Sequence, residues 1–282
     1  MGLALPINVY LAAWTLAPLL YLLYLSLTNW KVPNPRRFIW FGNYIEALGD
    51  PLFRHSVRVT FSYAFGVAAL EVAIGLFVAL LLHRRGWLST VTRSLFVVPM
   101  VLTPVVTAMM WRALLNPSFG PMNWVLGLVG FGPYEWHASP DTVWASLVMI
   151  DVWQWLPFPT LLILSGLMSL PDEPYEASQV DGASWSQQLR HLTLPMLRPI
   201  MVAAFFLRFL DALKVFDTVF VLTRGGPGTM TEVLSFHIYR FGLGEFFRLG
   251  YGSALSVLVV LMTGVLAFTV LRSLLKEPIT HA

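Results

Sequence analysis

The sequence contains no cysteine and few charged residues. None of its 282 residues is cysteine, and 12% are Asp, Glu, Lys or Arg, against about 25% in soluble domains. Without thiols the chain forms no disulfide, no cysteine-based zinc or iron–sulfur site and no thiolate nucleophile. The formal net charge of +3 is small and is spread over the loops, so the sequence offers no basic patch suited to nucleic acid.

Signatures of nucleotide and metal binding are missing as well. No glycine-rich phosphate loop is followed by Lys and Ser or Thr, so we expect no ATP site of that type on this chain. The six histidines are scattered without the spacing of metal ligands. No catalytic constellation stands out, and the sequence predicts a protein that is not an enzyme and carries no cofactor or metal of its own.

Apolar residues make up 57% of the chain. Roughly 20 apolar residues cross a bilayer as a helix. Six segments reach that length: residues 7–27, 57–82, 95–115, 143–168, 200–222 and 253–275. Continuous apolar runs favour helices over alternating strands. We therefore predict an all-α polytopic membrane protein of six transmembrane helices, with residues 1–282 forming one domain and the first span retained.

The longest polar interval is residues 170–199. Asp172 can cap a helix start, and Gly182 can adopt the left-handed conformation that ends a helix. Ser184 and Gln187 have the spacing of a capping box for a second helix. The pattern predicts a short helix, a tight turn and a second helix that returns into the membrane.

This interval resembles the EAA loop of ABC importer permeases, E-A-A-x-x-D-G-A followed by L-P-x-x-x-P. The residues matching its first half are Glu176, Ala177, Ser178, Asp181, Gly182 and Ala183, and those matching its second half are Leu194, Pro195 and Pro199. Ser178 replaces the second alanine. In that family the loop is the coupling helix, which docks on a cytoplasmic ATPase. The alternative interpretation is an amphipathic surface hairpin.

More of the chain resembles the maltose-type sugar permeases, a branch of that family with the fold of type I ABC importer transmembrane domains. The matching segments are residues 41–44, 116–120, 123–124, 222–227, 231–232 and 250–254. The resemblance implies a second permease subunit, two cytoplasmic ATPase subunits that hold ATP and Mg, and an extracytoplasmic binding protein that delivers sugar. It also implies a bacterial or archaeal cell membrane, with lipid around the spans. Both termini are expected to be cytoplasmic so that the loop meets the ATPase, although the positive-inside rule points weakly the other way.

Polar residues inside the expected spans are costly and need a reason. At about 100° per residue, Asp151, Gln154, Trp155 and Phe158 fall on one helical face. Carboxylates and amides pair with hydroxyls, and aromatic rings stack on sugars. The resemblance aligns these four positions with sugar contacts of the maltose permease. The alternative is an acid and interfacial aromatics near the outer water.

Three charged residues, Arg208, Asp211 and Lys214, follow one another at i, i+3 spacing on the fifth expected span. The resemblance aligns Arg208 with a sugar contact and places Thr103 beside the same pocket wall. Alternatively, Arg208 and Asp211 pair with each other or with Glu71 and hold helices together, and Thr103 only packs.

The sequence therefore predicts a permease subunit of an ATP-driven ABC importer, with a di- or oligosaccharide of the maltose or trehalose kind as the solute. A polyol or glycerol phosphate is the alternative solute, because Arg208 or Lys214 could face a phosphate. An ion-coupled secondary transporter and a non-transport assembly factor are alternative functions. The secondary transporter gives no reason for the polar loop at residues 170–199, and the assembly factor predicts no solute stimulation of a partner's ATPase.

Overall fold

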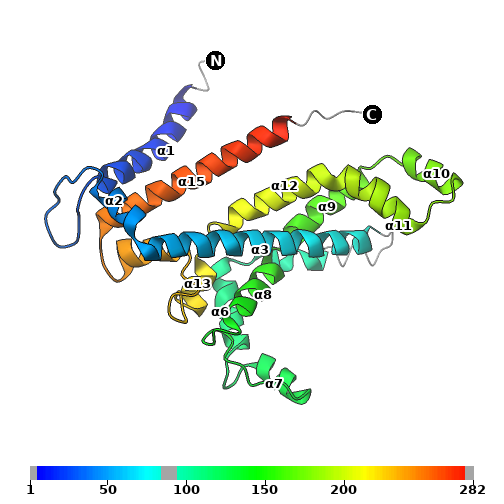
Figure 1. Ribbon diagram of the computed structural model, residues 1–282, viewed down its shortest axis with the longest axis horizontal. Helices are drawn as coiled ribbons and strands as arrows, with labels where there is room; N and C mark the ends of the chain where they lie inside the picture. Colours follow the sequence, from blue (N-terminus) through cyan, green and yellow to red (C-terminus); the bar gives the residue numbers. More distant parts are fainter. Residues whose placement is uncertain (1–4, 84–93, 277–282) are drawn as a thin grey trace. The chain divides into compact units, whose positions relative to one another are not determined.

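The computed structural model describes residues 5–83 and 94–276, and within these ranges the regular structure is helical apart from one isolated bridge between Thr28 and Phe38 (Figure 1). The contacts divide the chain into two units. One combines Met1–Val59 with Glu232–Leu271, and the other combines Thr60–Thr231 with Arg272–Ala282. The all-α prediction is confirmed for the described residues.

The first unit combines helices from the N-terminal part of the chain with helices from its C-terminal part. Its helices are α1 (Leu5–Ser26), α2 (Gly42–Gly49), the start of α3 (Pro51–Leu82), α14 (Leu234–Tyr239), the π-helix η3 (Arg240–Gly244) and α15 (Leu249–Lys276). Its buried core consists of Ala47, Phe53, Leu234, Tyr251 and Leu255. The amide of Asn43 donates to the carbonyls of Ser26 and Thr28 at 2.8 and 2.7 Å, which fixes the loop after α1 to α2.

The second unit contains the remaining helices. They are the rest of α3, α5 (Val98–Val101), α6 (Pro104–Leu114), α7 (Pro121–Leu128), α8 (Val143–Trp155), α9 (Pro157–Met168), α10 (Glu173–Val180), α11 (Trp185–Gln188), the π-helix η2 (Leu189–Thr193), α12 (Leu194–Ala212) and α13 (Asp217–Leu222). Helices α3, α9 and α12 lie side by side (Figure 1) around a core that includes Val72, Ile163, Leu197 and Ala204. A second core joins α6, α8 and α13 through Trp111, Ile150 and Val221.

The six-span prediction is not confirmed as a count for the described residues. Four helical stretches are long and apolar enough to cross a membrane: Ile7–Ser26, Pro51–Leu82, Trp185–Ala212 and Leu249–Val270. The pair α8 and α9, bent by 45°, makes a fifth if it is one span. The bend falls at Pro157, which lacks the backbone N–H that a continuous helix needs.

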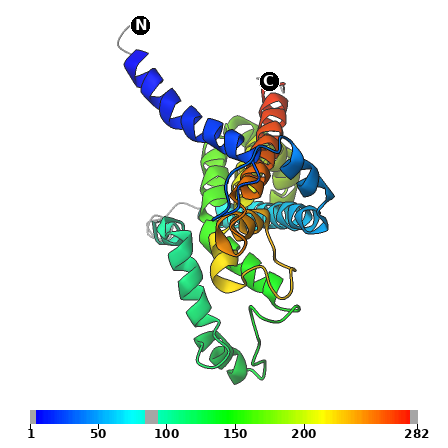
Figure 2. The same cartoon turned by 90° about the vertical axis from the view of Figure 1, so that its left-hand side faces the viewer.

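Two expected spans are interrupted. Residues 95–115 form α5 and α6, short helices separated by extended backbone at Leu102 and Thr103 (teal in Figure 2). The reason is Pro104, since a proline disfavours the helical conformation in the residue before it. The prediction of one helix over residues 200–222 is also wrong. Helix α12 begins at Leu194 and ends at Ala212, and α13 starts anew at Asp217, where charged residues break the apolar run.

Close packing of α3 against α9 depends on Gly75. A side chain there would meet the backbone N and the Oγ1 of Thr160, both at 3.2 Å, whereas Gly66 on the same helix has nothing within 4 Å. We predict that Gly75→Leu lowers the free energy of unfolding by about 1–3 kcal/mol, the usual cost of overpacking. Thermal unfolding of the purified protein measures this, with Gly66→Leu as the matched control. Equal effects of the two substitutions would contradict the packing argument.

Candidate functional site: an intramembrane charge cluster and a polar loop

The polar loop folds as a helical hairpin between α9 and α12. Helix α10 is followed by a turn in which Gly182 has φ +76°, the left-handed conformation that glycine tolerates best. The backbone N–H of Ser184 then donates to the side chain of Gln187 at 2.7 Å and starts α11. These two sequence predictions are confirmed. Asp172 stands at the N-cap of α10 but makes no capping hydrogen bond through its side chain.

Side-chain hydrogen bonds hold the two arms of the hairpin together. The amide of Gln188 donates to the Ser178 hydroxyl at 2.8 Å, and the hydroxyls of Tyr175 and Thr193 lie 2.9 Å apart. Ser178, the residue that departs from the family pattern, thus has a structural partner. No residue of α10 is buried, and Val180 is 89% exposed. The hairpin is a preformed projection whose outer face, which includes Glu176 and Asp181, has no covering element among the described residues.

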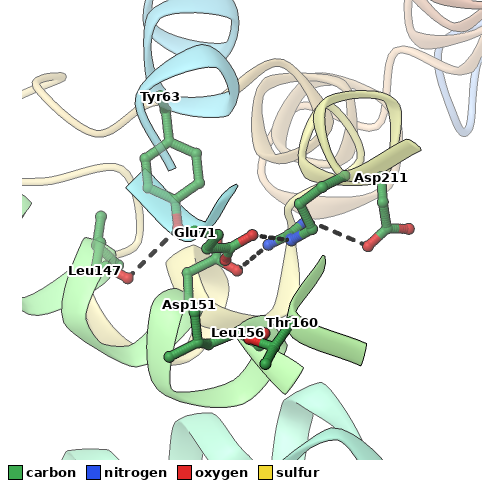
Figure 3. Close-up of polar contacts among 8 residues, drawn as sticks. Tyr63, Glu71, Leu147, Asp151, Leu156, Thr160 and Asp211 are labelled. Atoms are coloured by element: carbon green, nitrogen blue, oxygen red, sulfur yellow. Dashed lines mark hydrogen bonds and ion pairs between the residues drawn. The ribbon is translucent and has the colours of Figure 1, made fainter. Parts of the chain in front are cut away.

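Three carboxylates inside the spans, those of Glu71, Asp151 and Asp211, surround Arg208, and Figure 3 shows these acidic residues close together. The Nε of Arg208 lies 2.6 Å from Glu71 of α3, one terminal nitrogen pairs with Asp151 of α8, and the other lies 3.4 Å from Asp211 of α12. Arg208 is 2% exposed and Glu71 is 0% exposed. The sequence had left open whether Arg208 pairs with Asp211 or with Glu71, and the structure has both pairs.

Asp151 is held from two sides. Besides the Arg208 contact, its second oxygen accepts a hydrogen bond from the Tyr63 hydroxyl at 2.6 Å. Tyr63 therefore belongs to the cluster, although the sequence offered no signal for it beyond a polar group about two helical turns before Glu71. Together Tyr63, Glu71, Asp151, Arg208 and Asp211 connect α3, α8 and α12 through ion pairs and charge-assisted hydrogen bonds, and the latter are stronger than neutral ones.

A cavity of about 160 Å³ opens beside this cluster. It is lined by Pro104, Asp151, Gln154, Trp155, Arg208, Asp211, Ala212, Lys214, Val215, Phe216, Asp217 and Thr218. Five of the seven residues expected along the solute path are thus brought together. Phe158 and Thr103 are not among the lining residues, although Thr103 directly precedes Pro104.

The cavity lies where three helices are interrupted. Pro104 begins α6 after the break at Thr103, Trp155 ends α8 at the bend, and Ala212 ends α12. Breaks free backbone groups from helical hydrogen bonds, and at membrane depth such groups must be satisfied or line a cavity. The Gln154 amide donates to the carbonyl of Leu102 at 2.9 Å, which satisfies one of them. Interrupted helices around a polar cavity are typical of transporter binding sites.

Fold and cluster thus define a helical membrane protein of the transporter class, and comparison with known proteins gives the family. Residues 71–279 match the family described as binding-protein-dependent transport system inner membrane component, and the chain belongs to this family. It is 36% identical over 270 residues to the trehalose/maltose transport system permease protein MalF of Thermococcus litoralis, covering 94% of this chain and 89% of the relative.

Two further proteins show the same likeness. The trehalose transport system permease protein SugA of Mycobacterium tuberculosis is 32% identical, with 95% of this chain and 85% of the relative covered. Among solved structures, a bacterial ABC transporter involved in import of the acidic polysaccharide alginate superposes with a TM-score of 0.83 at 21% identity, covering 98% of this chain and 95% of that one. The fold is therefore that of ABC transporter permeases.

The cluster predicts different costs for its two cations. Arg208→Met would leave buried carboxylates without a partner, and we expect the free energy of unfolding to fall by about 3–5 kcal/mol. Lys214 also pairs with Asp211, at 2.8 Å, but is 70% exposed, so Lys214→Met should cost at most about 1 kcal/mol. Thermal unfolding in detergent compares the two variants. A small loss for Arg208→Met would show that the cluster does not support the fold.

Proposed function

We propose that this chain is a permease subunit of an ATP-driven importer for a di- or oligosaccharide delivered by an extracytoplasmic binding protein. The observation that carries the proposal is the preformed hairpin of α10 and α11, an exposed polar element that leads into α12, whose far end lines the cavity through Arg208, Asp211 and Ala212. Its relatives are named for trehalose and maltose transport, and family membership supports transfer of that activity to this chain.

In the proposed mechanism the work is done by partner subunits. A second permease completes the translocation path, and two cytoplasmic ATPase subunits bind ATP and Mg and receive Glu176, Ala177, Ser178, Asp181, Gly182 and Ala183 of the hairpin. Closure of the ATPases moves the hairpin, and α12 transmits the movement to the cavity. The spans alternate between an inward-open and an outward-open state. ATP can shift the equilibrium between them only if it interacts more favourably with one state than with the other. Both termini then lie on the cytoplasmic side, with the hairpin.

The cavity is the proposed solute site on this subunit. Asp211 and Gln154 offer groups for hydroxyls, and Trp155 offers an aromatic face for the apolar side of a sugar ring. At about 160 Å³ the cavity is smaller than typical ligand sites of roughly 300–1,000 Å³. This size fits the proposal that a second permease supplies the opposite wall for a solute larger than one sugar unit.

Gly182→Pro should uncouple ATP hydrolysis from transport. Proline fixes φ near −65°, which is incompatible with the observed +76°, so the turn before α11 must change. We expect solute uptake to fall at least about tenfold while the complex still inserts and assembles, because no residue of α10 is buried. Solute uptake and ATP hydrolysis by the reconstituted complex are measured side by side to test whether the two remain coupled.

Gly130→Pro is the matched control, since Gly130 also has positive φ, +83°, but lies in the loop after α7. Its uptake should remain near that of the unmodified complex. Normal uptake by Gly182→Pro would refute the coupling role of the hairpin.

Asp151→Ala should raise the half-saturating solute concentration by about tenfold or more, because the cavity loses a buried carboxylate and its ordered partners. Uptake as a function of solute concentration measures it, together with gel filtration to establish that the variant complex assembles. Asp141→Ala, at an exposed position in the loop before α8, is the control. Unchanged kinetics in an assembled Asp151→Ala complex would remove Asp151 from the solute site.

A further inference from the structure

Both cations that line the cavity are already paired with carboxylates of the chain. Each nitrogen of Arg208 has its own carboxylate: Glu71 at Nε, Asp151 at one terminal nitrogen and Asp211 at the other. The ammonium group of Lys214 lies 2.8 Å from the second oxygen of Asp211. Among the residues that the structure describes, each cation lining the cavity is therefore paired.

The flat face of Arg208 is covered as well. The ring of Trp155 lies 5.4 Å from the guanidinium carbon, within the range of a cation–π contact. Arginine recognises phosphate and carboxylate groups through two parallel N–H donors along one edge. Three carboxylates already face its three nitrogens, so an incoming anion that used the remaining N–H donors would lie beside groups of like charge.

Acidic groups outnumber basic ones around this cavity. Asp151, Asp211 and Asp217 line it and Glu71 lies behind Arg208, against the two cations Arg208 and Lys214. A solute with a phosphate or carboxylate would enter a site with an excess of like charge, and such repulsion suppresses binding of the wrong partner. An uncharged polyhydroxylated solute meets no such repulsion, because hydroxyls both donate and accept.

We infer that the cavity selects uncharged sugars over phosphorylated or acidic ones, and that Glu71 is a specificity-determining residue that does not touch the solute. Glu71 acts through Arg208: it occupies the Nε and neutralises a cation that would otherwise attract anions. The inference rests on the proposed function in one respect, namely that this cavity is the solute site. It replaces the glycerol phosphate alternative with a neutral polyol or sugar.

Lys214 is the position through which an anion could still bind. Its side chain is 70% exposed, and exposed ion pairs are weak. Turning Lys214 towards an anionic solute would leave Asp211 with only its 3.4 Å contact to Arg208, so the attraction gained is offset by repulsion from the Asp211 carboxylate. The substitution Asp211→Asn removes the repulsion between this carboxylate and an anionic solute. The Asp211 side chain is 41% exposed in the unmodified chain, so the fold should tolerate the substitution.

The experiment compares trehalose with trehalose 6-phosphate, two probes that differ by one phosphate group. The assembled complex is placed in lipid nanodiscs without its binding protein, so that the binding protein does not preselect the solute, and equilibrium dialysis gives a Kd for each probe. We expect trehalose to bind at least about tenfold more tightly than its phosphate. Glu71→Gln and Asp211→Asn should each reduce that ratio by about fivefold or more, chiefly by tighter binding of the phosphate.

Glu232→Gln is the control for loss of a buried acid in general. Glu232 is 0% exposed and pairs with Arg240 at 2.8 Å, but it does not line the cavity, so the ratio should stay unchanged. Equal or tighter binding of trehalose 6-phosphate to the unmodified complex would overturn the inference. An unchanged ratio in Asp211→Asn, or in a folded Glu71→Gln, would overturn it as well.

Failure of the proposed function has a different outcome. If neither probe binds, and maltose and glucose bind no better, then the cavity is not the solute site, and the inference falls with that assignment. If both trehalose and its phosphate bind with similar Kd values, the solute site stands and only the charge selectivity is refuted.

Discussion

A guanidinium group inside a membrane domain is the constraint on which the second unit depends. An isolated Arg208 would be costly at this depth, and the chain meets the cost with carboxylates from three helices, Glu71 on α3, Asp151 on α8 and Asp211 on α12 itself. All three carboxylates contact the same guanidinium group, so the positions of α3, α8 and α12 are mutually dependent. Buried ion pairs contribute little net stability compared with apolar packing. We therefore explain the cluster by its specificity: it stabilises one arrangement of the three helices and their polar groups over others.

Helix interruptions give this cluster an opening. The breaks at Thr103, Trp155 and Ala212 all border the same cavity, and each has a proline or charged residues as its local cause. In a continuous helix the backbone N–H and C=O groups would be hydrogen-bonded to one another, and side chains would fill the cavity. A binding cavity and broken helices thus have a common origin, because backbone left unpaired in the membrane must be turned towards other protein groups or towards a polar space.

The polar hairpin is a separate element with its own internal hydrogen bonds. Because Gln188 and Ser178 join its arms, it keeps its shape without burying any residue of α10. A rigid but uncovered projection is suited to receive force from a partner. Helix α12 connects this hairpin to the charge cluster in one element, from Leu194 to Ala212, so a movement of the hairpin has a direct mechanical route to Arg208 without a long chain of contacts.

The sequence by itself determined the helical class and the hairpin with its glycine turn, because each depends on local chemistry: apolar run length and a residue that tolerates positive φ. It also identified the charged residues inside the expected spans as candidates for function, because burying a charge in a membrane costs free energy. Only the tertiary structure decided that Glu71, Asp151 and Asp211 share one guanidinium, that Tyr63 completes the cluster, and that Phe158 lies off the cavity. Helical periodicity gives the face on which a residue lies, but the pairing of faces depends on the packing of helices that are far apart in the sequence. The interrupted spans at residues 95–115 and 200–222 were missed for a related reason, since hydropathy measures whether a segment is apolar and not whether its backbone continues as one helix.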